Sequence, residues 1–223
     1  MKPGWPSFAL ALATAVWAGP LEEARNRQDL ASLERMAQQR AAAAKDAASQ
    51  HAAAEAYAFA AEVALELRDK QKARALAEAG IRFAEQAVAA KPDSARYQRV
   101  LGALCGQVIP ANVLAGLRYG QRAREALDRA VQLEPGNPQV LISRGVGFYY
   151  LPESLGGGPA LALEQFEKAA QRDPKSDEAF LWMGLALRKL NRHAEARRAF
   201  ERSLELNPAR LWTRQQLDKT PAQ

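Results

Sequence analysis

The residue types that most often carry out catalysis are few in this sequence, and they do not form a catalytic pattern. The 223 residues include two histidines, His51 and His193, and a single cysteine, Cys105. Thiol catalysis needs a histidine close to the cysteine, and nothing in the local sequence pairs Cys105 with either histidine. Two adjacent carboxylates, Glu22 and Glu23, fall in a segment that we interpret as a loose start. We therefore predict a protein that is not an enzyme and has no catalytic residues.

Metal and phosphate sites lack the spacing that they need. The sequence has no H-E-x-x-H motif and no cluster of cysteines and histidines, so we expect no metal site and no cofactor. Gly156, Gly157 and Gly158 precede a predicted helix, and consecutive glycines can cradle a phosphate. No strand comes before them, however, and no Lys-Ser/Thr pair follows. We favour a specialised turn for this loop.

The charged side chains are numerous but mixed in sign. Lysine and arginine total 31 and aspartate and glutamate total 25, which gives a net charge of +6. Opposite charges often lie three or four residues apart, as on a solvated helix surface. Attraction to nucleic acid would favour a basic stripe with interleaved aromatic residues, and none is present. We expect no nucleic-acid partner.

The first eighteen residues look like a secretory signal peptide. Lys2 is followed by an apolar run, Phe8 to Ala18, which is short for a membrane span. Val16 and Ala18 offer small residues at the positions that favour cleavage after Ala18. A retained anchor or a buried helix is the alternative. No later segment could cross a membrane, so we expect export to the periplasm or outside the cell, with no membrane span after cleavage.

The elements that must carry any site follow a repeated spacing of small residues and prolines. The prolines end similar sequences at 92, 135, 174 and 208, and a glycine follows each of the first three by ten residues. A small residue precedes each proline by twelve residues, and a larger one usually lies four residues after it. The glycines are Gly102, Gly145 and Gly184, the small residues are Gly80, Ala123, Ala162 and Ala196, and the residues between are Ala84, Leu127, Phe166 and Phe200.

Each of these positions has a physical role in a pair of packed helices. Small residues let two helices approach closely, the larger residue fills the remaining gap, and proline ends the second helix. Helix-favouring residues dominate the composition. The successive units are 43, 39 and 34 residues long, and the insertions of nine and five residues fall between the two helices of a hairpin. We expect the insertions to form loops on one edge of the stack.

The domain layout follows from this spacing. Residues 1–18 form the signal peptide, and residues 19–48 form an N-terminal segment with an Ala-rich helix from Asp29 to Ala47. Residues 49–220 form the repeat domain. Its predicted hairpins are 49–92, 93–135, 136–174 and 175–208, and its predicted cap is 209–218. In that cap Leu211 and Trp212 should cover the end of the stack, with Gln215 and Gln216 toward water.

The last unit, Asp177 to Arg210, resembles the tetratricopeptide repeat closely, with Phe180, Met183-Gly184 and Leu187 in place and a 34-residue period. The chain resembles exported bacterial proteins of this kind. The run Tyr150-Leu151-Pro152 followed by Gly156–Gly158 is also similar to the T component of tripartite ATP-independent periplasmic transporters. The resemblance implies an all-α, right-handed solenoid of antiparallel helix hairpins with a C-terminal capping helix. It also implies a scaffold that binds another protein.

The resemblance places partner binding in the concave groove lined by the first helices. Ala103, Val146 and Leu185 replace the asparagine that a carboxylate clamp needs, so we expect a more apolar peptide or amphipathic helix. A small hydrophobic ligand is the alternative occupant, as in an accessory subunit of a transport system. The inserted edge competes with the groove as the binding site, and the sequence leaves the oligomeric state open. The groove candidates are Arg99, Gln107, Tyr149, Tyr150, Trp182 and Arg188.

Overall fold

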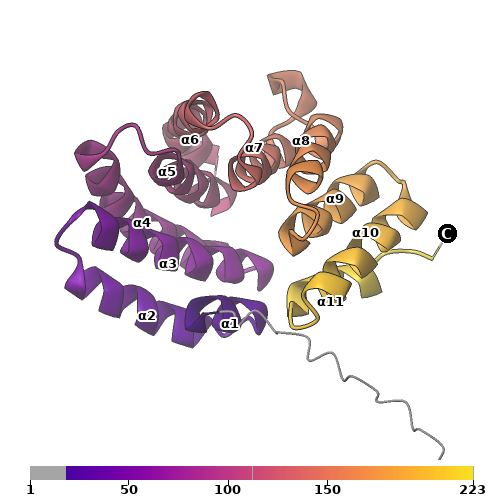
Figure 1. Cartoon of the computed structure of the whole chain (residues 1–223), viewed down its shortest axis with the longest axis horizontal. Helices are drawn as coiled ribbons and strands as arrows, with labels where there is room; N and C mark the ends of the chain where they lie inside the picture. Colours follow the sequence, from indigo (N-terminus) through magenta and orange to yellow (C-terminus); the bar gives the residue numbers. More distant parts are fainter. Residues whose placement is uncertain (1–18, 112, 223) are drawn as a thin grey trace, which may run out of the picture.

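The computed structural model describes residues 19–111 and 113–222, and the regular structure in these ranges is entirely helical. The helices follow one another with short connections (Figure 1). They are α1 (Pro20–Asn26), α2 (Leu30–Ala43), α3 (Ala47–Glu66), α4 (Lys70–Ala90), α5 (Ala95–Val108), α6 (Val113–Leu133), α7 (Pro138–Tyr150), α8 (Pro159–Arg172), α9 (Asp177–Lys189), α10 (His193–Leu206) and α11 (Leu211–Asp218), with 3₁₀ turns η1 (Ile109–Ala111) and η2 (Glu153–Leu155).

Four hairpins, α3–α4, α5–α6, α7–α8 and α9–α10, form the body of the molecule. In three of them the glycine of the first helix lies against the large residue of the second. A Cβ on Gly102 would meet Leu127, one on Gly145 would meet Phe166, and one on Gly184 would meet Phe200. The glycine leaves room for the ring or the branched side chain, so the helices pack closely. The predicted all-α solenoid is confirmed.

Prolines and capping residues divide the chain into these units. Each second helix of the four hairpins ends within two residues of its proline. A polar side chain caps the start of most first helices, as where Ser176 accepts a hydrogen bond from the backbone N–H of Ala179 at 3.3 Å. Such a cap satisfies a backbone donor that has no partner within the helix. The sequence therefore fixes the helix ends locally.

The first helices of successive hairpins form the inner face of the array. Helices α3, α5, α7 and α9 contact one another in order along the chain. The second helices, α4, α6, α8 and α10, lie farther apart on the outside. Helices that converge on one side and diverge on the other make a curved stack, which Figure 1 shows as an arc. The inner face is thus lined by the helices that we expected to form the groove.

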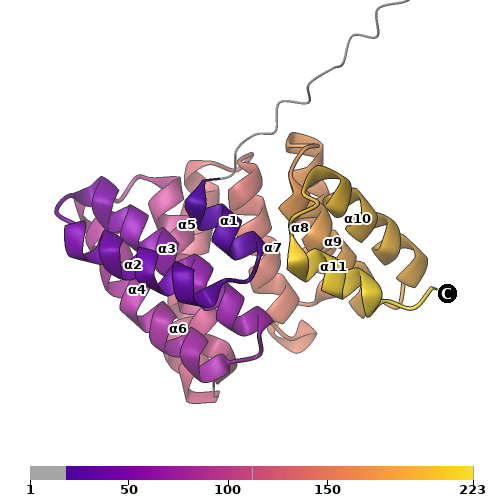
Figure 2. The same ribbon diagram turned by 90° about the horizontal axis from the view of Figure 1, so that it is seen from below.

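The arc curves so far that its two ends meet. Helix α1 lies beside α11 in both views (Figures 1 and 2), and the side chain of Arg210, the residue before α11, donates hydrogen bonds to the Arg25 carbonyl and to Glu62. The prediction of a loose start at residues 19–28 is wrong, because α1 occupies most of that segment and is held in this contact. The prediction for the cap also needs correction. Gln216 is buried, Gln215 bonds to Gln28, and Leu211 is 40% exposed.

The nine-residue insertion lengthens a helix and does not form a loop, contrary to the sequence prediction. Helix α6 begins ten residues before Ala123, whereas α8 and α10 begin three residues before Ala162 and Ala196. The inserted run continues the helical pattern of α6, with Ala115 and Tyr119 buried. The five-residue insertion does form a loop, which contains η2.

The buried side chains form two main clusters that divide the molecule. One spans α1 to α6 and the other spans α7 to α10, with Trp212 and Leu217 of α11 packed against it. The N-terminal cluster is rich in alanine, so its helices pack closely. None of the described helices is both long and apolar enough to cross a membrane. The predicted signal peptide, residues 1–18, lies outside the described residues.

Candidate binding surfaces

Four aromatic residues from three helices meet on the inner face. We call Tyr149, Tyr150, Trp182 and Trp212 the inner aromatic cluster. The ring of Trp182 lies 5.7 Å from that of Tyr149, 6.2 Å from that of Tyr150 and 5.7 Å from that of Trp212, all edge to face. Trp182 is buried, but Tyr150 is 57% exposed. The cluster therefore offers one solvent-facing aromatic ring on a rigid base.

Lys189 adds a cation to the edge of this cluster. Its Nζ lies 3.8 Å from the ring centroid of Tyr149 and donates a hydrogen bond to the Tyr149 carbonyl at 2.8 Å. Partial burial lowers the pKa of the ammonium group. The contact joins α9 to the C-terminal end of α7, and it fixes the orientation of Tyr149.

Arg99 is the cation of α5 that faces the interior of the ring. It is half-buried, and within residues 19–111 and 113–222 no hydrogen bond or ion pair engages it. Burial lowers the pKa of its guanidinium, while the carboxylates of Glu178 and Glu55 act in the opposite direction. These carboxylates belong to α9 and α3, so Arg99 lies between the two sides of the inner face.

The surroundings of Tyr150 on α7 also include groups from the opposite side of the inner face. Burial raises the pKa of its hydroxyl, with further contributions from Tyr149 and from the carboxylates of Glu62 and Glu66 on α3. Its side chain nevertheless stays more than half exposed. The hydroxyl thus has protein on several sides, at some distance from it. This is expected for a concave surface that solvent can enter.

Two of the predicted groove residues are engaged within the structure. The amide nitrogen of Gln107 donates to the Ala58 carbonyl at 3.0 Å, which joins α5 to α3. Arg188 donates to the carbonyl and the side chain of Gln216, at 3.2 and 2.8 Å, and so holds α11. Of the six predicted groove residues, Arg99 and Tyr150 retain the free polar or aromatic surface that a partner would need.

The glycine loop uses its amide groups internally. The N–H of Gly156 donates to Glu153, that of Gly157 to Pro152 and that of Gly158 to Phe148, at 3.0, 3.1 and 2.8 Å. Gly156 and Gly158 have φ angles of 80° and 108°, which L residues rarely adopt. With these donors occupied, the loop has the arrangement of a tight turn and no free amide cradle.

Two arginines and two glutamates join the ends of the arc. We call Arg25, Glu62, Glu66 and Arg210 the closure cluster. Arg210 is 1% exposed and donates to Glu62 at 3.0 Å, to both oxygens of Glu66 and to the Arg25 carbonyl at 3.1 Å. Arg25 donates to both oxygens of Glu62, at 3.0 and 2.6 Å. Buried charges of this kind are stable only when paired and hydrogen-bonded, as they are here.

The closure cluster continues toward the inner face and the last repeat. Arg25 also contacts Glu178 of α9 at 3.1 Å, and its guanidinium lies 4.7 Å from the centroid of the Phe59 ring. The amide of Asn207 donates to Asn26 at 3.3 Å and to Asp177 at 2.8 Å. The contacts span almost the whole sequence, so the ring is closed by specific polar bonds.

The two carboxyl groups of the closure cluster titrate differently. Burial raises the pKa of Glu66 to about 7, against the effect of Arg210 and with the neighbouring charge of Glu62. The pKa of Glu62 is lowered, because Arg25 and Arg210 together outweigh the burial that raises it. Glu66 is therefore the member that changes charge near neutral pH.

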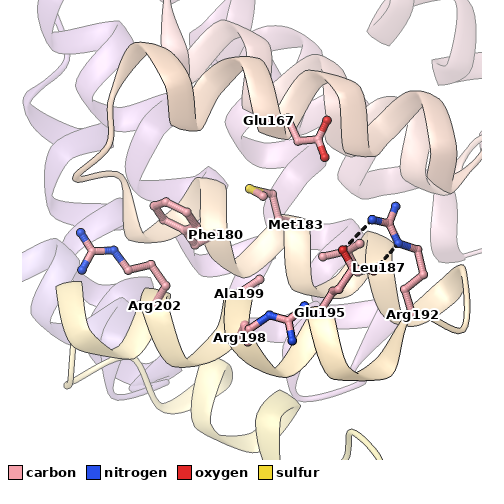
Figure 3. A pocket seen from close by; sticks show the side chains of 9 residues that line it. All are labelled: Glu167, Phe180, Met183, Leu187, Arg192, Glu195, Arg198, Ala199 and Arg202. Carbon is pink, nitrogen blue, oxygen red and sulfur yellow. Dashed lines mark hydrogen bonds and ion pairs between the residues drawn. The ribbon is translucent and has the colours of Figure 1, made fainter. Parts of the chain in front are cut away.

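A second surface lies on the outside of the last repeat. Here Phe180, Met183 and Leu187 of α9 form the floor of a hollow of about 250 Å³ between α8 and α10 (Figure 3). We call it the outer groove. Its rim carries Glu167, Arg192, Glu195, Arg198 and Arg202. Phe180 and Met183 are half-buried, so apolar surface is open to solvent.

Comparison with known proteins agrees with this geometry. Residues 177–210 match the tetratricopeptide repeat, which is the unit formed by α9 and α10. The chain contains a tetratricopeptide repeat. No curated protein is significantly similar to it in sequence. A thermophilic tetratricopeptide-repeat protein from Thermus thermophilus is similar in structure, with a TM-score of 0.56, 18% identity, and coverage of 88% of this chain and 97% of that one.

The haemophore HusA from Porphyromonas gingivalis is also similar in structure, with a TM-score of 0.57 and 18% identity, over 75% of this chain and 93% of that one. At these identities the likeness concerns the fold. The helical hairpins of this chain thus have the fold of tetratricopeptide-repeat proteins.

The sequence patterns did not predict the closure cluster of this repeat protein. Glu62 and Glu66 lie one helical turn apart in a helix otherwise dominated by alanine, and that spacing places both carboxylates on one face. Arg210 follows Pro208 at the start of the predicted cap. These signals mark a polar patch on α3, but no local pattern names a partner 144 residues away.

The two remaining residues considered for catalysis, His51 and Cys105, have structural roles. His51 is buried and stacks on Tyr97 with ring centroids 4.6 Å apart. Burial lowers its pKa to about 4, so it is neutral at pH 7. Cys105 is buried, as expected, and burial raises its pKa to about 11. A buried thiol with a raised pKa is a poor nucleophile.

Proposed function

We propose that this repeat protein is an exported scaffold that binds a segment of another protein on its inner face. The observation that carries the proposal is the exposure of Tyr150 over Trp182, and it is supported by Arg99 of α5, which has no ion pair in the described residues. Tyrosine and arginine are both enriched among the residues that dominate binding energy. The expected partner segment carries an apolar or aromatic side chain and a carboxylate.

The closed ring limits how such a segment can bind. The closure cluster joins α1 and α3 to the end of the chain, so a partner must enter along the ring axis or bind when the ends separate. A short segment can enter more easily than a globular surface. We therefore favour an extended or helical segment over a folded domain.

The test is a comparison of partners retained by three versions of the full chain. The wild type, a double variant Arg99→Glu/Tyr150→Ala and a control Arg124→Glu are used as bait with an extract of exported proteins. Arg124 is exposed on the outer helix α6. We expect the double variant to lose partners that the control keeps. Identical partner sets for all three would contradict binding at the inner face.

A small hydrophobic ligand is the second candidate occupant of this surface. The observation that favours it is the same exposed ring of Tyr150 over Trp182. The hollows between α8 and α10 and between α1 and α2 lie away from this surface. Native mass spectrometry of the purified chain distinguishes the two, because only a ligand carrier would retain a small molecule of fixed mass.

Export is a separate part of the proposal and rests on residues 1–18. After expression in a bacterium with the secretory pathway, we expect the exported protein to begin at Gly19. N-terminal sequencing of the protein from the periplasm and from the medium tests this. A chain that retains Met1 and stays in the cytoplasm would contradict export.

A further inference from the structure

The spaces between neighbouring outer helices differ from one repeat to the next. In α7 and α9 the residue just before the central glycine faces such a space. In α7 this residue is Arg144, whose guanidinium lies 5.5 Å from the centroid of the Phe148 ring and 3.6 Å from the carboxylate of Asp128 on α6. The side chain of Arg144 therefore covers the floor of the space between the outer helices α6 and α8.

The space between α4 and α6 is closed in another way. Arg122 of α6 forms an ion pair with Glu85 of α4. The hydroxyl of Tyr119 on α6 donates to Glu78 of α4 at 3.3 Å. These contacts tie the two outer helices together across α5, so little room is left for another chain.

The outer groove has neither a covering arginine nor contacts that tie its two outer helices together. The residue before Gly184 is Met183, which is uncharged and half-buried. Among the residues that the structure describes, no hydrogen bond or ion pair joins α8 to α10 across the groove. Figure 3 shows the floor between the two helices with the charged side chains at its rim. This space is therefore open where the earlier two are covered or tied.

The rim of the outer groove carries three arginines against two glutamates, Glu167 and Glu195, which is an excess of one positive charge. Arg192 and Glu195 pair with each other at 2.7 Å. Arg198 is exposed, without an ion pair in the described part of the chain. Arg202 pairs with Glu205 on the same helix at 2.8 Å and lies 5.9 Å from the Phe180 ring. An exposed pair of this kind is weak, so both arginines can turn toward a partner.

We propose that the outer groove docks an acidic segment of another protein, which inserts a bulky apolar side chain over Phe180 and Met183. The acidic side chains of that segment meet Arg198 and Arg202. Methionine adapts its shape easily and is common at surfaces that accept a partner. The proposal adds a second docking surface, on the opposite side of α9 from the inner aromatic cluster.

The test uses the full chain and a short fluorescein-labelled peptide, with leucines on one helical face and glutamates on the other. Fluorescence anisotropy gives its dissociation constant. A second peptide has the same leucines and lysines in place of the glutamates. We expect only the acidic peptide to bind, with an affinity that falls as salt is added. No binding of the acidic peptide, or equal binding of both, would overturn the proposal.

Variants then locate the site. Met183→Arg introduces the residue type that covers the equivalent space at Arg144, and we expect it to weaken binding by at least about tenfold. Arg198→Glu and Arg202→Glu change exposed residues, and we expect about tenfold weaker binding for the pair. The control, Arg124→Glu, reverses an exposed arginine of α6 and should leave binding unchanged. Unchanged binding in the Arg198→Glu/Arg202→Glu variant would count against the outer groove.

Two further measurements separate this site from other occupants. Arg99→Glu should leave peptide binding intact, so failure of the inner-face proposal would not affect this one. Sedimentation at several concentrations tests whether a second copy of the chain occupies the groove. A dimer that Met183→Arg dissociates would overturn the proposal of an acidic partner.

Discussion

Single residues decide where this chain can bend and where its helices can approach. Gly145 and Gly184 lie against phenylalanine rings, and a Cβ at either position would collide with the ring. Gly157 lies in the loop after α7, where a Cβ would collide with the backbone of Leu151. A clash with backbone is harder to relieve than one with a side chain, because the loop itself must move.

We therefore expect Gly157→Ala to destabilise the protein by about 2 kcal/mol, within the range of strained loop positions. Urea unfolding followed by circular dichroism measures the change. Gly136→Ala is the control, since a Cβ there would have only Arg172 near it, at 3.9 Å. It should shift stability by no more than about 0.5 kcal/mol. Equal effects of the two variants would contradict the role of the Gly157 contact.

Glu66 gives the protein a pH dependence near neutrality. Its pKa is about 7 when folded, above its ordinary value of 4.5, so the folded state binds the proton more tightly. The stabilisation from this proton is fully present below about pH 4.5 and is lost as the pH rises through 7. We expect the melting temperature to fall between about pH 6.5 and 8.

Glu66→Gln replaces the protonated carboxyl by a neutral amide and should remove most of this dependence. The chosen range avoids Glu62, whose lowered pKa acts at acidic pH, and His51, whose pKa of about 4 acts below 6.5. Arginine side chains in general stay charged across this range. A wild type whose melting temperature is level across this range would contradict the assignment to Glu66.

At the scale of the helix, two arginine side chains hold α11, Arg188 of α9 and Arg197 of α10. Arg188 donates to the carbonyl and side chain of Gln216 and reaches Thr220 at 3.4 Å. Hydrogen bonds to a charged group contribute more than neutral ones, about 1.5 to 3 kcal/mol each. Although α11 is only eight residues long, it is held in place at the seam of the ring.

We expect Arg188→Met to loosen α11 selectively. Amide hydrogen exchange should speed up in residues 211–218, while α3 and α4 keep their protection, because local opening does not require global unfolding. Arg198→Met removes an arginine that has no such contacts, and it should leave exchange unchanged. Faster exchange throughout the molecule would show that Arg188 supports more than this helix.

At the scale of the molecule, the closure cluster decides whether the array is an arc or a ring. Arg210 is almost fully buried between Glu62, which also pairs with Arg25, and Glu66, whose one ion pair among the described residues is with Arg210. Removing one partner of a buried pair leaves an uncompensated charge, at a cost of about 3 to 5 kcal/mol. Hairpins in a repeat array depend mainly on their neighbours, so they should survive the loss of closure.

We therefore expect Arg210→Met to open the ring without unfolding the hairpins. Small-angle X-ray scattering should show a larger radius of gyration, and circular dichroism should show the same helix content. Adding Glu66→Gln should restore part of the lost stability, because the unpaired carboxylate is removed. Arg214→Met, on the exposed side of α11, is the control. An unchanged radius of gyration would show that the ends stay together without Arg210.

The sequence by itself determined the helical hairpins, the positions of Gly145, Phe166, Gly184 and Phe200 within them, and the ends of the helices at their prolines. These features depend on residues within one repeat, so their spacing is visible in the chain. The sequence also marked Arg99 and Tyr150, which keep free surface on the inner face.

Only the tertiary structure decided that the ends meet and that the outer groove stays open. Each repeat adds a small rotation, and the sum over all hairpins sets the distance between α1 and α11. That sum depends on the packing of every pair of helices, including the lengthened α6, and no local pattern contains it. The same packing placed Arg188 and Gln107 in internal hydrogen bonds and left Met183 uncovered.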